Sequence, residues 1–145
     1  MYFVDREKIE ATIDYLEKLA NIFENQQTWE TEVEQKALER IAQMMIETVL
    51  DIGNGIIDGF IMRDPGSYED IIDILTDESV VGKAEAEGLK RLISFRKILV
   101  QNYLDIRHPE LEETIKTYLP VLKHFVQRVR SYLEDELGPV NAFKH

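Results

Sequence analysis

The chain has 145 residues, 44% of them hydrophobic, which is enough for one domain with a sizeable core and too short for two ordinary domains. It contains no cysteine, which excludes disulfides, thiolate nucleophiles and cysteine zinc sites. The formal net charge of −11 disfavours a general binder of nucleic acids or anionic membranes. The first residues lack the basic and apolar regions of a signal peptide, and no segment approaches about 18 apolar residues without a charge, so we expect a soluble cytosolic protein without membrane contact.

The first half of the chain is predicted to form two amphipathic helices. The first follows Asp5, whose side chain can cap it, and has apolar residues at steps of three and four. The second runs from about Thr31 to Phe60, with an inner face that begins at Val33. The break "RDPGS" ends it, and Ser67 opens a short third helix.

The second half is predicted to form two further helices, from about Val80 to Tyr103 and from Pro109 to just before Gly138. Pro120 predicts a kink within the last one. The expected fold is therefore all-α, an antiparallel bundle of four long helices and one short helix. We expect a single domain over residues 1–137 and a C-terminal tail over residues 138–145.

An arginine interrupts the apolar face of the helix expected from Val80 to Tyr103. At about 100° per residue, Arg96 falls within roughly 60° of a stripe of apolar side chains. A buried, unpaired arginine is costly, so its charge must be paired or used. Two interpretations are open: the guanidinium pairs with an acid such as Asp51, or it lines a cleft that two subunits share.

The stretch "LDIGNGII" places Gly53 and Gly55 inside the second helix, between Asp51 and Asn54. Glycine within a helix costs about 1 kcal/mol relative to alanine, so two glycines this close require a reason. We favour a tight helix crossing over a functional role. Asp51 and Asn54 are retained as supporting polar residues for a site.

Few other motifs indicate chemistry. The chain has no Gly-rich phosphate loop, HExxH pair or nucleophile turn, and its three histidines lack the spacing of metal ligands. We therefore expect neither a metal nor a cofactor. Residues 1–90 carry 8 basic against 21 acidic side chains, whereas residues 91–145 carry 9 against 7, so an anion site is expected in the last third.

The segment from Arg96 to Tyr103, "RKILVQNY", resembles the motif of the HepT-like proteins, toxins of prokaryotic toxin–antitoxin pairs within the HEPN ribonuclease superfamily. Their motif is arginine, a polar residue, three further residues, histidine, any residue and tyrosine. The resemblance covers most of the chain. It includes "DREKIEATIDYLEKL", "ALERIAQMMIETVLDIGNGII", "DPGSYEDIIDILTDESVV", "GLKRLISFRKILVQNYLDI" and the closing helix.

The resemblance implies a HEPN-like helical bundle that dimerises and cuts RNA, without a metal, in a cleft lined by the motif helices of both subunits. Arg96 and Gln101 occupy the two catalytic positions of the motif, and Lys97 and Asn102 are expected to contact RNA phosphate. Tyr103 takes the place of the tyrosine to which a nucleotidyltransferase antitoxin attaches AMP. The implied partners are therefore a second copy of the chain, RNA and such an antitoxin.

Gln101 stands where the motif has histidine, and this departure changes the chemistry. A glutamine amide forms hydrogen bonds but cannot act as a general acid or base near neutral pH. We expect RNA cleavage to be weak or lost; His108, beyond the expected helix end, is a poor substitute. The alternatives are a catalytically silent HEPN dimer that binds a nucleotidyltransferase or a nucleotide, and a structural helical module.

Overall fold

The computed structural model describes residues 3–139, and every regular element in this part of the chain is a helix, which confirms the all-α prediction. Within it, no helix combines the length and the apolar character needed to cross a membrane. The elements are α1 (Arg6–Asn25), α2 (Glu32–Gly59), α3 (Tyr68–Asp77), α4 (Lys83–Ile93), α5 (Arg96–Val100), the 3₁₀ turn η1 (Tyr103–Asp105) and α6 (His108–Leu137).

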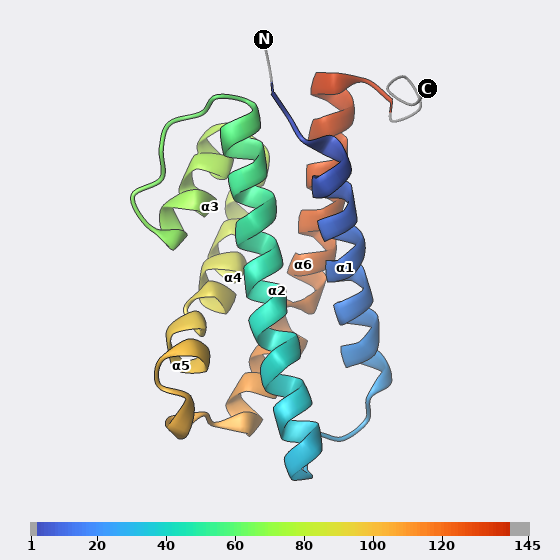
Figure 1. Ribbon diagram of the computed structural model, residues 1–145, viewed down its shortest axis with the longest axis vertical. Coiled ribbons are helices and arrows are strands. Elements are labelled where there is room, and N and C mark those ends of the chain that lie inside the picture. The colour runs from blue at the N-terminus through green and yellow to red at the C-terminus, as the bar shows by residue number, and fades with distance from the viewer. Residues whose placement is uncertain (1–2, 140–145) are drawn as a thin grey trace.

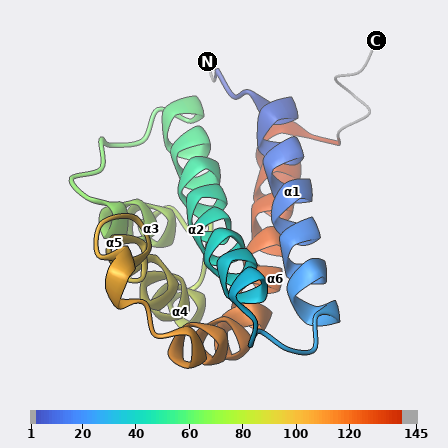
Figure 2. The same ribbon diagram turned by 60° about the horizontal axis from the view of Figure 1, so that its bottom comes forward.

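The helices form an antiparallel bundle around α2 (Figure 1). Helix α1 packs along one side of α2, while α3, α4 and α5 lie on its other side (Figure 2). Helix α6 runs behind α2 and contacts both α1 and α4, which closes the bundle. Fully buried side chains from every layer meet between these helices, among them Ile13, Leu38, Ile72, Leu89 and Phe125.

Local side-chain caps explain why three helices begin where the sequence predicts. The side chains of Asp5, Thr31 and Ser67 each accept a hydrogen bond from the backbone N–H three residues further on. Each bond satisfies one of the donors that a helix leaves free at its N-terminus. The inner face of α2 begins later than expected, because Val33 is exposed and Leu38 is the first buried residue.

The prediction of one helix from Val80 to Tyr103 is wrong, because the chain breaks at Ser94 and Phe95. Ser94 Oγ donates to the carbonyl of Arg91 at 2.6 Å, and the N–H of Phe95 bonds three residues back, to Leu92, instead of four. Such tight 3₁₀ pairing and serine back-bonding bend helices. The bundle therefore has three long helices, and its fourth side consists of α4, α5 and η1.

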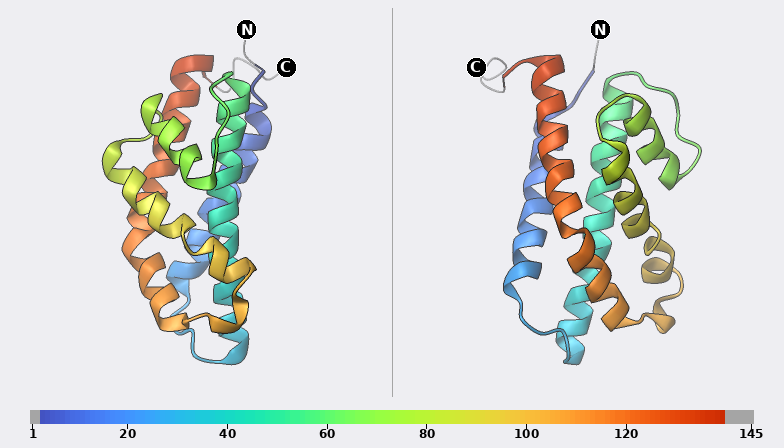
Figure 3. Two further views of the ribbon diagram at one scale, coloured as in Figure 1. Left: turned by 90° about the vertical axis from the view of Figure 1, so that its left-hand side faces the viewer. Right: turned by 180° about the vertical axis from the view of Figure 1, so that it is seen from behind.

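The last helix starts with Pro109 in its first turn, as expected, and passes through Pro120 without interruption. Its axis curves along its length (Figure 3). It ends at Leu137, followed by Gly138 with φ 84°, a backbone conformation that favours glycine. Of the tail expected over residues 138–145, residues 140–145 lie outside the described part of the chain.

Candidate functional site

Arg96 is the first residue of α5, and its charge is paired. Its Nε donates to Oε1 of Glu47 on α2 at 2.7 Å. The guanidinium carbon lies 4.4 Å from the centre of the Tyr68 ring, at the start of α3. The hydrogen bond to Glu47 raises the pKa of Arg96 above its usual value, so the guanidinium stays charged at every working pH. Three elements therefore meet at this one cation.

The acid that pairs with Arg96 is thus Glu47, one helical turn before Asp51, which was named as an example of such an acid. The side chains of Arg96 and Glu47 are 25% and 27% exposed, so the pair lies at the edge of the core and not inside it. The break before α5 explains this position. The apolar stripe is buried up to Leu99, and beyond it the side chains turn towards solvent.

The remaining motif residues are exposed: Lys97, Gln101, Asn102 and Tyr103. The backbone N–H groups of Gln101 and Asn102 both bond to the carbonyl of Lys97, which ends α5 and starts the turn that carries Tyr103. The motif residues therefore do not all lie on one helix, contrary to the helix expected from Val80 to Tyr103. Among the hydrogen bonds and ion pairs within residues 3–139, none joins the side chain of Arg96 to that of Gln101.

Asp51 and Asn54 lie in a different setting. They line a depression between α1 and α2 together with Lys8 and Asp58, and neither Arg96 nor Glu47 lines it. Gly55 contacts Ile9 of α1 at this place, and Gly53, facing the other way, contacts Ile71 of α3. The glycines therefore permit tight helix crossings on both sides of α2. A supporting role for Asp51 and Asn54 stays a prediction.

His108 has a partner of its own at the start of α6. Its Nε2 lies 2.7 Å from Oε2 of Glu39, and both side chains are mostly buried. Burial alone would raise the pKa of Glu39, but hydrogen bonds from His108 and Lys36 outweigh it and lower that pKa below its usual value. This pair ties α6 to α2. Within the described residues, no three potential metal ligands cluster.

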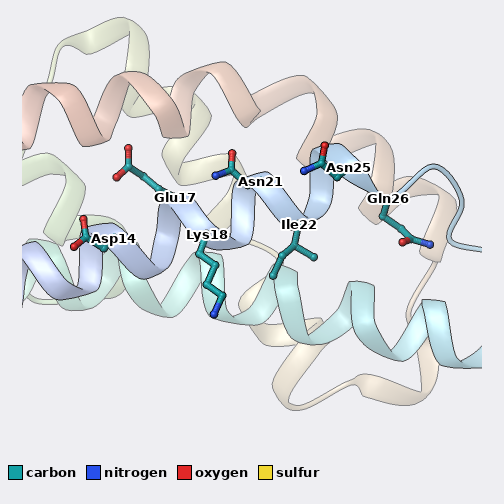
Figure 4. A pocket seen from close by; sticks show the side chains of 7 residues that line it. All are labelled: Asp14, Glu17, Lys18, Asn21, Ile22, Asn25 and Gln26. Atoms are coloured by element: carbon teal, nitrogen blue, oxygen red, sulfur yellow. The ribbon is translucent and has the colours of Figure 1, made fainter.

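A further hollow lies on the outer surface of α1, and Figure 4 shows its seven lining side chains standing along one helix. They do not converge on a common point. Its two carboxylates, from Asp14 and Glu17, each accept a hydrogen bond from Arg130 of α6 at 2.9 Å. These acidic groups therefore serve helix packing, and the hollow lacks the convergent polar groups of a binding site.

Glu47 and Tyr68 are the two residues of this site that the sequence does not single out. Glu47 lies 49 positions before Arg96, so only the folded chain reveals the contact. One signal was present: Glu47 is a charged residue between buried Ile46 and Thr48 in an otherwise apolar stretch of α2. Tyr68 resembles any aromatic residue at the start of a helix.

The helical arrangement matches that of solved toxin structures. A solved structure described as a tri-AMPylated Shewanella oneidensis HEPN toxin in complex with MNT antitoxin aligns with a TM-score of 0.76 at 17% identity, covering 85% of this chain and 96% of that one. A toxin–antitoxin structure with AMP-PNP aligns with a TM-score of 0.73 at 17% identity, covering 86% and 96% of the two chains. At this identity the likeness shows the fold, which is that of HEPN toxins.

The particular family follows from the sequence match. A model described as "Ribonuclease HepT-like" matches residues 9–129, and the chain belongs to this family. The Bacillus subtilis protein YutE, named as a candidate RNase, is 54% identical over 144 residues, which cover 99% of this chain and all of YutE. The solved structure of YutE, described as a cytosolic protein of unknown function, aligns with a TM-score of 0.95.

Proposed function

We propose that this protein is a metal-independent endoribonuclease of the toxin–antitoxin type, acting as a homodimer, with a low rate because Gln101 replaces the motif histidine. The observation that carries the proposal is the placement of Arg96. Its charge is fixed at the edge of the core, next to a surface formed by Lys97 and the exposed residues after α5. It lies in the last third of the chain, where residues 91–145 carry 9 basic against 7 acidic side chains.

The chemistry of RNA cleavage indicates what the site supplies and what it lacks. The 2′-oxygen attacks phosphorus and loses its proton, while the 5′-oxygen leaves and gains one. The extra negative charge that develops on the phosphoryl oxygens is stabilised by a nearby guanidinium such as that of Arg96. The proton transfers need a group that titrates near neutral pH, and the amide of Gln101 cannot provide it.

Homodimer formation is supported by the apolar surface beside Arg96. Tyr103 is 62% exposed and Leu104 is 89% exposed, and Val100 and Tyr68 also reach solvent. Contiguous exposed apolar side chains are typical of interaction surfaces. A second copy packed here would bring two Arg96 side chains and two motif turns around one cleft. Light scattering at micromolar concentration should give twice 16.9 kDa, and a 16.9 kDa monomer would refute this part of the proposal.

The exposure of Tyr103 also supports its proposed modification by a nucleotidyltransferase antitoxin. Its phenol oxygen would attack the α-phosphorus of ATP and displace pyrophosphate, which leaves AMP on the tyrosine. The added phosphate would place negative charge on the surface that otherwise attracts RNA. After co-expression with such an enzyme, mass spectrometry should find the AMP adduct on Tyr103. An adduct elsewhere, with Tyr103 unmodified, would contradict the assignment.

The direct test incubates the purified protein with labelled RNA in the presence of EDTA. We expect slow cleavage that EDTA does not inhibit and that Arg96→Ala abolishes. Lys18→Ala removes the same charge from the outer face of α1 and serves as the matched control, because Lys18 lies in the hollow of Figure 4 and not beside Arg96. Cleavage by the repurified protein that survives unchanged in Arg96→Ala would contradict the assigned site.

A second candidate function is favoured by Gln101 itself. The side chain is exposed and contributes no proton-transfer group, so a silent dimer that only binds a nucleotidyltransferase or a nucleotide fits the same surface. This alternative predicts no cleavage of any RNA by the native protein, together with a stable complex with the partner enzyme. Co-purification of the two proteins, without cleavage by the free dimer, would favour it over the first proposal.

A further inference from the structure

The guanidinium of Arg96 is restrained by two contacts that act in different ways. The hydrogen bond from its Nε to Glu47 fixes the direction of the side chain, and the ring of Tyr68 beneath it fixes the plane. The two contacts come from α2 and α3, so the guanidinium is held between elements that are themselves packed into the bundle. Much of the rotamer freedom that arginine normally loses on binding is therefore lost already on folding.

The Arg96 side chain remains 25% exposed beside these contacts, so part of the guanidinium stays within reach of a ligand. Glu47 engages Nε, and it is the one carboxylate within residues 3–139 that forms an ion pair with Arg96. The two Nη groups carry four further N–H donors in a planar fork. Such a fork matches two oxygens of a phosphate, which is why arginine is preferred where a phosphate must be held in a fixed orientation.

We propose that Glu47 and Tyr68 are positioning residues that hold Arg96 as a preorganised receptor for a phosphodiester of RNA. The proposal rests on the proposed function, because it names the residues that orient the cation of that same site. Glu47 and Tyr68 do not themselves touch the phosphate. Their contribution is to keep the guanidinium in one orientation, so that RNA binds without first ordering the arginine.

A purely electrostatic view predicts the opposite effect for Glu47. Its negative charge lies next to Arg96, so its removal should strengthen the attraction for RNA. If Glu47 positions the arginine, Glu47→Ala should instead weaken binding, even though the protein becomes less acidic. Glu47→Gln separates the two effects, because the amide oxygen can still accept the hydrogen bond from Nε while the charge is gone.

The experiment measures binding of a labelled 2′-O-methyl oligoribonucleotide by fluorescence anisotropy over a range of salt concentrations. We expect Glu47→Ala to bind about tenfold more weakly, which corresponds to the loss of one well-placed charged contact. The slope of log Kd against log salt should fall by about one, as for the loss of one phosphate contact. Glu47→Gln should stay within about threefold of the native protein.

The control Asp58→Ala removes the same charge from an exposed position of α2, where Asp58 forms no ion pair with any described residue. It should bind RNA slightly more tightly than the native protein.

Tyr68→Ala provides a second variant, because Tyr68 is half exposed and contributes little to the core. It should also weaken binding, while Tyr68→Phe keeps the ring and should not. In an Arg96→Ala background, Glu47→Ala should cause no further loss.

Two results would overturn the inference: Glu47→Ala binding as tightly as Asp58→Ala, or the native protein failing to bind the oligonucleotide at low salt. The test remains separate from that of the proposed function, because 2′-O-methyl RNA lacks the attacking hydroxyl and reports binding alone. If the protein cleaves ordinary RNA but the Glu47 variants bind RNA as the native protein does, the inference is refuted and the proposed function stands. If RNA binding depends on Glu47 but no RNA is cleaved, the inference stands and the proposed ribonuclease function is refuted.

Discussion

Replacing Gly53 by alanine tests how closely α2 and α3 approach. A Cβ atom at Gly53 would lie 2.5 Å from Cγ2 of Ile71 and 3.4 Å from Cδ1 of Leu75. Ile71 is fully buried and β-branched, so it cannot turn away without disturbing the core. Overpacking of this kind lowers the free energy of unfolding by about 1–3 kcal/mol, whereas the better helix propensity of alanine raises it by about 1 kcal/mol.

Gly55→Ala is the matched comparison, because it brings the same gain in helix propensity two residues further along α2. Its Cβ would meet Ile9 at 3.1 Å and 3.3 Å, which a small shift can accommodate. Subtracting one variant from the other therefore removes the propensity term and leaves the steric cost. We expect Gly53→Ala to be less stable than Gly55→Ala by about 1–3 kcal/mol.

The assay is urea unfolding followed by circular dichroism, with thermal unfolding as a check. The midpoints should differ while the m-value stays unchanged, and each kcal/mol should correspond to roughly 3 °C in Tm for a chain of this size. Equal stability of the two variants would show that α3 does not press on α2 at Gly53. That result would refute the explanation given for this glycine.

Two further predictions concern local structure. The hydrogen bonds from Arg63 and from the N–H of Gly66 lower the pKa of Asp70 from 3.8 to about 2. Because the folded-state pKa of Asp70 is depressed, the stabilisation of the fold by the ionised carboxylate is present above pH 3.8 and is lost as the pH falls through about 2. An NMR titration of the Asp70 carboxyl carbon should give a midpoint of about 2. A midpoint near 3.8 would contradict the hydrogen bonds to Asp70. Ile61 lies two residues beyond the end of α2, has φ 56° and is 66% exposed, so Ile61→Gly should stabilise the protein by about 1 kcal/mol in urea unfolding. Ile61→Ala keeps the Cβ atom and should not stabilise the protein. Equal gains in stability from Ile61→Gly and Ile61→Ala would exclude backbone strain as the cause.

The helix starts were predictable because capping is a local interaction. Asp5, Thr31 and Ser67 each bond to a backbone N–H three residues away, and such a signal needs no knowledge of the fold. The tight crossing at Gly53 was equally visible, since glycine inside a helix is costly unless another helix approaches closely.

The break before α5 was not predictable from periodicity. The apolar spacing continues across Ser94 and Phe95 without a proline or glycine, and the bend depends on the hydroxyl bond to Arg91 and on packing. The same holds for Val33, which fits the helical stripe but lies in the first turn of α2, where no other helix covers it.

The site itself could be predicted only in part. The family resemblance points to Arg96 through the motif, but its pairing partner required the fold, because Glu47 and Asp51 are one turn apart on the same helix and look equivalent in sequence. Tyr68 comes from α3, whose position relative to α5 follows from the break that the sequence conceals. Long-range contacts of this kind are not encoded in local spacing.

The central claim is that Arg96 anchors an RNA-cleaving site that lacks only its proton-transfer group. Gln101→His restores that group at an exposed position, so it should cost little stability. One well-placed histidine typically contributes about 10² to 10⁴ in rate, so cleavage of labelled RNA should rise from weak or absent to readily measurable. The gain should disappear in the double variant with Arg96→Ala, whereas Lys97→Ala should mainly weaken binding in a salt-dependent manner.

The decisive measurement is therefore the initial rate of RNA cleavage by Gln101→His, with and without Arg96→Ala, on several RNAs and with folding and dimerisation verified. The account predicts a rate increase of about 10² or more that depends entirely on Arg96. A folded, dimeric Gln101→His protein that cleaves none of these RNAs would contradict it and would favour the silent, partner-binding dimer.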